Sequence, residues 1–227
     1  MTWHPDMPQE FRNQIVTGDA RVLAERIPDE SVDLIFTDPV YDRIDDYRWL
    51  AETAARVLKP DRACFVFCGI EWIPQELNAL GEYLAYRWQF SFTPVQAGGS
   101  RFWSGMMRRC WIAGVWFEKG TSKLYGRIFD SMALPSGHNQ TGHGNRHKWE
   151  KGLKWMRFVG RAFCPKDGIA LDPFTGSGTI PAVCKQLGRN YVAFEIDPNT
   201  AELARERVRN TQPPLFVPEP EQMELEL

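Results

Sequence analysis

Cysteine is scarce in this sequence and is not arranged in closely spaced pairs. The 227 residues include five cysteines, and none of them forms a C-x-x-C motif. An odd number of cysteines without such a motif excludes a disulfide framework and a structural zinc site built from cysteine pairs. We therefore expect these side chains to be small buried thiols in a reducing compartment.

Long hydrophobic runs and an amino-terminal targeting pattern are also missing. No stretch approaches the roughly 20 apolar residues that a membrane-spanning helix needs. Residues 1–14 lack a basic segment followed by an apolar one, and no internal repeat is present. These absences predict a cytoplasmic protein without contact to a membrane.

Net charge is close to zero, but it is distributed unevenly. The chain carries 27 Lys and Arg against 29 Asp and Glu, a formal net charge of −2. Residues 101–161 contain twelve basic and three acidic residues, a net charge of +9, so the remainder of the chain carries −11. Such an asymmetry predicts a cationic patch on an otherwise acidic protein, as nucleic-acid binding requires.

Strand-like and helix-like segments alternate along both ends of the chain. Apolar runs predict strands at residues 14–18, 32–39, 63–69, 88–93, 110–117, 168–174 and 190–197. Helices are predicted at residues 20–27, 47–58, 74–84, 150–164, 175–188 and 200–210, the second of them capped by Asp45 or Asp46. This alternation predicts an α/β fold with a mainly parallel sheet and helices on both faces. Ligands bind beyond the carboxyl ends of such strands, so Asp38 and Asp172 are expected on one rim.

A glycine-rich turn follows the strand that ends at Asp172. Gly176, Ser177 and Gly178 open a helix whose first N–H groups are free, and the glycines let a ligand approach the backbone. The next strand ends about 20 residues later in Glu195, where an acid can accept hydrogen bonds from ribose hydroxyls. The full dinucleotide fingerprint and a Gly-Lys-Ser/Thr phosphate loop are both absent. On this motif alone, a strand–turn–helix without a ligand stays open.

A second polar turn follows the strand predicted at residues 32–39. Asp38 supplies a carboxylate, Pro39 a main-chain carbonyl and Tyr41 an aromatic ring. Together these groups suit a flat substrate that carries an amino group. Asp-Pro turns also follow strands without any function, so this turn alone decides nothing.

In their order and context, the two turns resemble the DNA amino-methyltransferases that use S-adenosylmethionine, the N6-adenine/N4-cytosine class with a Rossmann-like fold. The catalytic motif precedes the cofactor motif and the basic segment lies between them, an order called the beta group. The resemblance covers about residues 13–210 and is carried by residues 18–20 (GDA), 28–42, 56–60 (RVLKP), 147–151 (HKWEK), 171–179 (LDPFTGSGT) and 194–198 (FEIDP).

The resemblance implies S-adenosylmethionine as the cofactor and a role for particular residues. Asp38 and the Pro39 carbonyl would accept the two N–H bonds of the target amino group and favour a localised lone pair for attack on the methyl group. Tyr41 would stack on the flipped base. The implied cofactor-binding residues are Asp19, Asp172, Pro173, Phe174, Gly176, Ser177, Gly178, Thr179, Glu195 and Asp197, with His147 and Lys151 from the His-x-x-x-Lys element.

One position departs from the family pattern. Val40 stands where the catalytic motif of the family has its second proline. Proline fixes φ and lacks an N–H, whereas valine is β-branched and stiff at χ1. The carbonyl that accepts a target hydrogen belongs to Pro39, which is kept, so we expect activity to survive.

The basic middle segment is expected to be an inserted, loop-rich target-recognition region at about residues 94–148. It would lie within a single methyltransferase domain, 1–227, whose residues 211–227 we expect to be a disordered acidic tail. The candidate contacts to phosphates and guanine edges are Arg101, Arg108, Arg109, Lys123, Arg127, Arg146 and Lys148, with Asn139 and Gln140 suited to adenine. The expected partners are double-stranded DNA and a second copy in a homodimer. A restriction endonuclease would be a separate chain in the bacterial or phage-infected cell.

Several alternatives remain open on the sequence. An Asp-led catalytic motif favours adenine N6, whereas Ser-led motifs are more typical of enzymes that methylate cytosine N4. Methylation of RNA or of a protein glutamine keeps the cofactor, but the long basic segment argues against it. A non-catalytic DNA-binding remnant would be consistent with Val40. His138, His143 and His147 lack a Cys or carboxylate at ligand spacing, so we expect no metal site.

Binding of DNA through the basic segment should depend steeply on salt. If phosphates are held there, released counterions make the affinity fall on the order of a hundredfold or more between about 50 and about 200 mM salt. Fluorescence anisotropy of a labelled duplex measures this dependence. A dissociation constant that does not change over this range would contradict the cationic patch.

Overall fold

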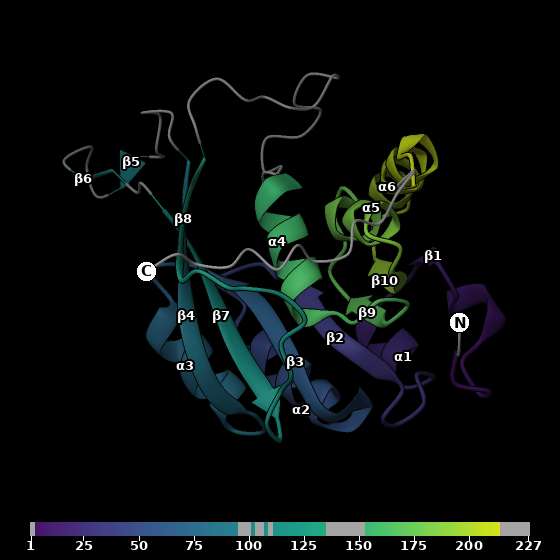
Figure 1. Ribbon diagram of the computed structural model, residues 1–227, viewed down its shortest axis with the longest axis horizontal. Helices are drawn as coiled ribbons and strands as arrows, with labels where there is room; N and C mark the ends of the chain where they lie inside the picture. Colours follow the sequence, from purple (N-terminus) through teal and green to yellow (C-terminus); the bar gives the residue numbers. More distant parts are fainter. Residues whose placement is uncertain (1–2, 95–100, 103–106, 109–110, 135–152, 214–227) are drawn as a thin grey trace, which may run out of the picture.

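A central eight-stranded sheet organises the molecule (Figure 1). The structure is a computed structural model that describes residues 3–94, 101–102, 107–108, 111–134 and 153–213. The helices and strands, in chain order, are η1 (Gln9–Phe11), β1 (Gln14–Thr17), α1 (Ala20–Ala24), β2 (Val32–Thr37), α2 (Ile44–Val57), β3 (Leu58–Cys68), α3 (Ile73–Gly81), β4 (Ala85–Pro94), β5 (Arg101–Phe102), β6 (Met107–Arg108), β7 (Ile112–Lys119), β8 (Ser131–Leu134), α4 (Leu153–Phe163), β9 (Ile169–Asp172), α5 (Thr179–Gln186), β10 (Asn190–Glu195) and α6 (Pro198–Asn210).

The strand order of the sheet is β1-β10-β9-β2-β3-β7-β4-β8. Neighbouring strands from β1 to β3 are all parallel, β4 and β8 are parallel to each other, and β7 is antiparallel to both β3 and β4. The prediction of a mainly parallel α/β sheet is therefore confirmed for the described strands. We call the edge at which β2, β3, β9 and β10 end the carboxyl rim, and the edge at which they begin the amino rim.

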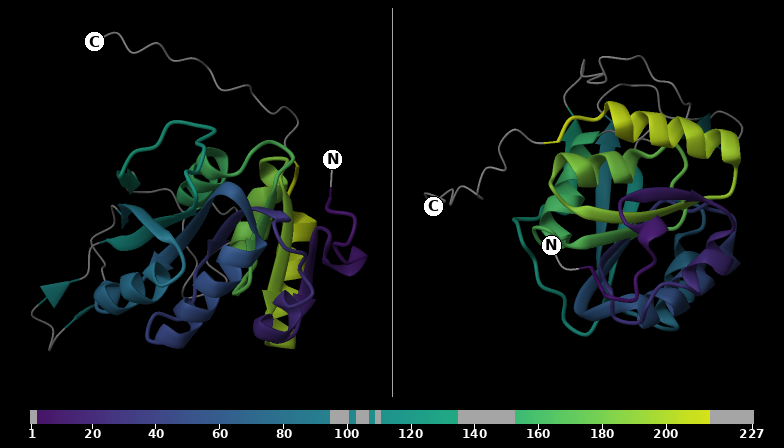
Figure 2. Two further views of the ribbon diagram at one scale, coloured as in Figure 1. Left: turned by 90° about the horizontal axis from the view of Figure 1, so that it is seen from below. Right: turned by 90° about the vertical axis from the view of Figure 1, so that its right-hand side faces the viewer.

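Helices cover both faces of the sheet and give the molecule three layers (Figure 2). Buried side chains of α1, α2 and α3 pack on one face together with η1, and those of α4, α5 and α6 pack on the other. Strand β2 lies in the middle, and all six of its residues are buried. A strand that is covered on both faces cannot alternate apolar and polar side chains, which is why this segment reads as one apolar run.

Several predicted boundaries differ from the structure. Helix α2 begins at Ile44, so Asp45 and Asp46 lie in its first turn, and its N-cap is Arg43 without a side-chain hydrogen bond. The predicted cap is therefore wrong, although both acids still lie at the positive end of the helix dipole. Strand β3 begins at Leu58, because the chain turns directly from α2 into the sheet.

Residues 94–148 are not one continuous insertion. Strand β7 lies inside this range, and its residues 113–118 are buried between β3 and β4. The chain leaves β4 at the carboxyl rim and enters β7 there, since Phe92 pairs with Ile112 and Cys68 pairs with Ala113. It also leaves β8 at this rim, where Leu134 pairs with Pro94. Because β7 is antiparallel to its neighbours, the chain leaves both β4 and β8 at the carboxyl rim.

The predictions for the tail and for the cysteines can be compared with the structure only where it describes these residues. Residues 214–227 lie outside the described residues, so the expected acidic tail stays a prediction. The four described cysteines, Cys64, Cys68, Cys164 and Cys184, are buried and form no disulfide bond, as predicted. In the parts of the chain that the structure describes, no helix has the length and hydrophobicity to span a membrane.

A buried acid fastens the sheet at the amino rim. The Asp33 carboxylate, 5% exposed, pairs with the Lys59 ammonium at 2.8 Å and with Nε of Arg62 at 3.1 Å. Its Oδ2 also accepts the main-chain N–H of Ile169 at 3.0 Å. One side chain of β2 therefore joins both neighbouring strands, β3 and β9.

Removal of this acid should destabilise the fold. In the Asp33→Ala variant two cations lose their partner and a buried N–H is left without an acceptor, so the free energy of unfolding should fall by about 3 kcal/mol. Chemical denaturation measures it. The matched control is Asp29→Ala, which removes an exposed partner of Arg56 and should cost under about 1 kcal/mol. Equal losses in the two variants would contradict the role of Asp33.

Candidate active site

The two predicted polar turns meet at the carboxyl rim. Strands β2 and β9 are parallel neighbours in which Ile35 pairs with Leu171. Just beyond, the Thr37 hydroxyl donates to Oδ1 of Asp172 at 2.7 Å. Asp38 follows Thr37 directly, and its charge acts on Asp172. The prediction that Asp38 and Asp172 share one rim is therefore confirmed.

Asp172 is an acid in an unusual environment. It is 1% exposed, and its Oδ2 has no hydrogen-bond partner among the described residues. Burial raises the pKa of this carboxyl to about 7, the bonds from Thr37 and from the Phe174 N–H lower it, and the charge of Asp38 raises it further. An unsatisfied buried oxygen carries a free-energy cost that a bound donor would remove.

The glycine-rich turn between β9 and α5 is built for a close backbone approach. Gly176 has φ of 52°, and a Cβ at this position would meet nothing within 4 Å. Gly178, with φ of 77°, packs against the backbone of Ala204 in α6, where a Cβ would come within 3.0 Å of its Cα. The first glycine leaves open space at the turn, and the second lets two helices come together.

Glu195 ties this turn to the end of β10. Its Oε2 accepts the N–H of Gly176 at 2.8 Å and its Oε1 accepts the N–H of Asp197 at 2.9 Å. A carboxylate accepts about four hydrogen bonds, so two positions remain for a ligand. The main-chain oxygen of Glu195 accepts the Gly18 N–H at 2.9 Å, which brings the end of β1 alongside.

Two of the predicted cofactor residues also cap helices. Asp19 accepts the N–H of Arg21 at 2.8 Å at the start of α1, and Asp197 accepts the N–H of Thr200 at 2.7 Å at the start of α6. The bond from Thr200 holds the pKa of Asp197 below its usual value. Both carboxylates are exposed and lie at the rim beside Glu195.

An arginine that the sequence did not single out holds the same turn. Nη1 of Arg207 in α6 donates to the Thr179 hydroxyl at 2.8 Å and to the Ser177 hydroxyl at 3.2 Å. These two side chains, predicted to contact the cofactor, thus face the protein. Arg207 lies in a helix with many charged residues, so its sequence context gave no signal.

Phe174 forms the side of the turn that faces α2. Its ring makes an edge contact with Trp49, with 5.7 Å between the ring centroids, and the guanidinium of Arg21 lies 5.6 Å from the Trp49 ring. Arg21 also pairs with Asp46 at 2.7 Å. Pro173, the residue before Phe174, is buried.

The catalytic turn predicted after β2 is partly open. Pro39 is buried and Asp38 is half-buried, while the Val40 side chain is 56% exposed. Val40 therefore projects from the rim where the family has proline. The Tyr41 side chain packs on the main chain of Gly69, because a Cβ there would lie 2.6 Å from Cβ of Tyr41.

The structure brings only some of the predicted DNA-contacting residues to this rim. Arg101 and Arg108 pair in the two-stranded β5–β6 ladder, which follows β4 at the carboxyl rim. Lys123 lies at the amino rim, where its N–H donates to the Asp61 carbonyl, so it does not join the site. Arg127 is exposed on the segment that returns toward β8. The remaining candidates, Arg109, Asn139, Gln140, Arg146 and Lys148, lie outside the described residues, as do His147 and Lys151.

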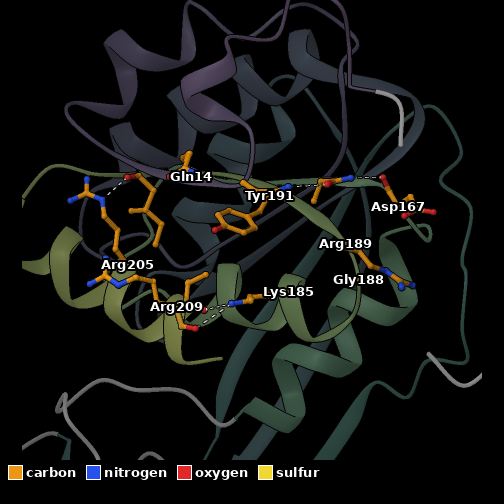
Figure 3. Close-up of a pocket in the computed structure, with 12 residues that line it drawn as sticks. Gln14, Asp167, Lys185, Gly188, Arg189, Tyr191, Arg205 and Arg209 are labelled. Carbon is orange, nitrogen blue, oxygen red and sulfur yellow. Dashed lines mark hydrogen bonds between the residues drawn. The ribbon is translucent and has the colours of Figure 1, made fainter. Parts of the chain in front are cut away.

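A cavity of about 540 Å³ lies at the opposite edge of the sheet (Figure 3). The Tyr191 ring stands in it, and Lys185, Arg189 and Arg205 lie around it. Lys185 donates to the main-chain carbonyl of Val208, and Arg205 donates to that of Ile15. These hydrogen bonds give both cations a structural role. The cavity is separate from the candidate site, and no cluster of potential metal ligands occurs among the described residues.

The residues at the carboxyl rim fit the cofactor that the sequence implies. The free Oδ2 of Asp172 can accept from an ammonium group, Glu195 keeps acceptor positions for hydroxyls, and Gly176 leaves room at the backbone. S-adenosylmethionine carries an ammonium and two ribose hydroxyls, so the donor and acceptor sets match.

Asp172 should make the stability of the protein depend on pH. Its pKa is about 7 in the folded protein and 3.8 as a free side chain, so the folded state holds the proton more tightly. The free energy of unfolding contributed by this group therefore falls as pH rises from about 4 to about 7. Relative to wild type, Asp172→Asn should gain on the order of a few kcal/mol across that range.

Denaturation curves at several pH values measure this difference. Glu52→Gln, which removes an exposed charge from α2, controls for the loss of one carboxylate. A difference between Asp172→Asn and wild type that stays constant from pH 4 to pH 8 would contradict the raised pKa.

Comparison with known proteins supports the same interpretation. The family model for N6/N4 DNA methylases matches residues 107–206. The type II methyltransferase M.HinfI of Haemophilus influenzae is 25% identical, over 90% of this chain and 70% of its own length. M.HpaI of Haemophilus parainfluenzae is 27% identical over 86% and 74%. M.BamHI of Bacillus amyloliquefaciens is 25% identical over 87% of this chain and 57% of its own.

Solved structures share the fold. M1.HpyAVI in complex with SAM has a TM-score of 0.71 at 24% identity, over 86% of this chain and 98% of its own. The PvuII DNA methyltransferase, described as cytosine-N4-specific, has a TM-score of 0.74 at 18% identity, over 85% of each chain. Together with the relatives and the family match, these findings show that the chain is similar to the S-adenosylmethionine-dependent N6-adenine/N4-cytosine DNA amino-methyltransferases.

Proposed function

We propose that this protein is a site-specific DNA methyltransferase that transfers a methyl group from S-adenosylmethionine to N6 of adenine in duplex DNA. The observation that carries the proposal is the hydrogen bond from Thr37 to Asp172. It joins the end of the strand that supplies Asp38 to the end of the strand that supplies the cofactor turn. Donor and acceptor of the methyl group would therefore meet at one point of the rim.

The cofactor would be held by the turn after β9 and by the end of β10. The free oxygen of Asp172 is suited to its ammonium group and Glu195 to its ribose, while Gly176 leaves space for the approach. Asp19 lies at the neighbouring end of β1, beside the position expected for the adenine. When bound, S-adenosylmethionine supplies a methyl group attached to a sulfonium, which is open to nucleophilic attack.

Asp38 and Pro39 would prepare the amino group that attacks. The lone pair of an exocyclic amine is delocalised into the base, which makes the amine a poor nucleophile. Two acceptors aimed at its N–H bonds favour a localised lone pair and stabilise the positive charge that develops on nitrogen. The new N–C bond would form as the S–C bond breaks, the sulfur would leave as the neutral thioether S-adenosylhomocysteine, and the nitrogen would then lose a proton to solvent. The base must leave the helix to reach this rim, and Tyr41 would stack on it.

Adenine is favoured over cytosine because the catalytic motif begins with Asp38. In this family Ser-led motifs are more typical of cytosine-N4 enzymes. The PvuII enzyme, described as cytosine-N4-specific, shares the fold at 18% identity, and a likeness at that level supports the fold alone. Cytosine N4 is therefore the second candidate.

DNA would be bound at the carboxyl rim by the basic segment. Arg101 and Arg108 stand opposite each other in the β5–β6 ladder, and the chain leaves β4 and β8 toward the same side. Lys123 at the amino rim is not part of this surface. A homodimer and a separate restriction endonuclease stay part of the proposal, since the relatives are type II methyltransferases.

The Asp38→Ala variant should bind S-adenosylmethionine but lose methyl transfer. Loss of one preorganised acceptor should lower kcat by on the order of a hundredfold to a thousandfold. Calorimetry measures cofactor binding, and transfer of labelled methyl to DNA measures kcat. The control is Asp42→Ala, which removes an exposed carboxylate four residues along the chain and should leave kcat unchanged. Normal transfer by Asp38→Ala would overturn the assignment.

The modified base itself is identified in DNA from expressing cells. Nucleoside mass spectrometry of this DNA should show N6-methyladenine with wild-type protein and none with Asp38→Ala. N4-methylcytosine in its place would establish the second candidate. Sequencing that reports modified bases then gives the recognition sequence.

A further inference from the structure

Glu76 is a carboxylic acid that lies wholly inside the protein near the carboxyl rim. It belongs to the first turn of α3 and is 0% exposed. Its Oε1 accepts the main-chain N–H of Gly69 at 3.0 Å. Its Oε2 is buried, and no hydrogen-bond donor reaches it within the described part of the chain. A carboxyl group in such a position costs free energy, so its retention calls for a physical reason.

The surroundings of Glu76 bring the pKa of its carboxyl group close to neutral pH. Burial raises its pKa to about 7, whereas the Gly69 N–H and the side chains of Tyr47 and Cys68 lower it. Both the ionised and the neutral form still offer an oxygen to the Gly69 N–H. The hold on Gly69 is therefore kept on either side of neutral pH.

Gly69 is the surface on which Tyr41 rests. It follows the last residue of β3, and a Cβ there would lie 2.6 Å from Cβ and 2.9 Å from Cγ of Tyr41. Such distances mean that the Tyr41 side chain touches the bare main chain. A shift of the Gly69 main chain would therefore move the Tyr41 side chain.

Tyr47 forms a second connection between the side chains of Glu76 and Tyr41. Its hydroxyl donates to the Phe67 carbonyl at 3.0 Å, next to the end of β3. Burial raises the pKa of Tyr47, and the charges of Cys68, Glu76 and Tyr41 raise it further. Glu76 and Tyr41 therefore act on the same buried phenol.

We propose that Glu76 is a positioning residue for the target base. By holding the Gly69 main chain, it sets the place of the Tyr41 side chain, three residues after Asp38. A base that stacks on Tyr41 would then present its amino group within hydrogen-bonding reach of the Asp38 carboxylate. This inference rests on the proposed roles of Tyr41 and Asp38 in the methyl transfer. If Glu76 only capped the turn between β3 and α3, its removal would leave the Tyr41 side chain unaffected.

The position of Tyr41 can be followed directly in the full chain. Incorporation of 3-fluorotyrosine labels the six tyrosines, and the Tyr41→Phe variant assigns one ¹⁹F signal to Tyr41. In Glu76→Ala this signal should shift, and kcat with bacterial genomic DNA should fall on the order of tenfold to a hundredfold, as expected for a displaced substrate. The dissociation constant for S-adenosylmethionine should not change, because Asp172 and Gly176 are untouched.

Two further variants separate positioning from general loosening. Glu76→Gln keeps an oxygen for the Gly69 N–H, so the signal and kcat should stay near wild type. Gly69→Ala forces a Cβ against Tyr41 while Glu76 is intact, so it should reproduce the shift and the loss. The matched control is Leu80→Ala, which removes another fully buried side chain of α3 without touching Gly69.

Clear results would overturn the inference. They are a Tyr41 signal that is unmoved in Glu76→Ala, or a signal that Leu80→Ala moves equally. Failure of the proposed function is a separate result, namely wild-type protein that binds S-adenosylmethionine but methylates no DNA. The ¹⁹F signal needs no turnover, so it tests the coupling between Glu76 and Tyr41 in either case.

Discussion

The hydrogen bond between Thr37 and Asp172 is the contact on which the candidate site depends. It is fully buried and joins the ends of two central parallel strands at 2.7 Å. Each strand carries one half of the chemistry, with Asp38 on one side and the glycine-rich turn on the other. Since β2 and β9 pair directly, a slip of either strand by one residue would turn Asp172 or Thr37 to the other face and separate the two halves.

Buried acids at the two edges of the sheet serve different purposes. Asp33 at the amino rim has two cations and an N–H as partners, so its charge is balanced within the protein. Asp172 and Glu76 near the carboxyl rim each have an oxygen without a donor among the described residues. These two acids with an unpaired oxygen thus lie near the rim where ligands are expected, and the fully paired Asp33 lies where the fold is fastened.

The sequence predicts the scaffold well because its signals are local. Apolar runs and turn residues identify the described strands of the large sheet except β8, and the order of the two polar turns places Asp38 and Asp172 on one rim. Contacts between distant segments were not predictable. Arg207 holds Ser177 and Thr179 from a helix about 30 residues away, and a charge pattern does not indicate this contact. Lys123 was placed with the DNA-contacting residues by charge alone, whereas the antiparallel direction of β7 carries it to the other rim.

The reversed direction of β7 has a consequence for how this scaffold can change. It makes the connection from β4 to β7 and the connection from β8 to α4 both start and finish on the side where the base would be methylated. The strand ends that these connections join lie at one rim, so the connections can change in length without altering strand register. Under the proposed function, the chemistry and the reading of sequence would thereby be inherited separately. A lineage built on this fold could then acquire a new target sequence while its methyl-transfer machinery stays the same.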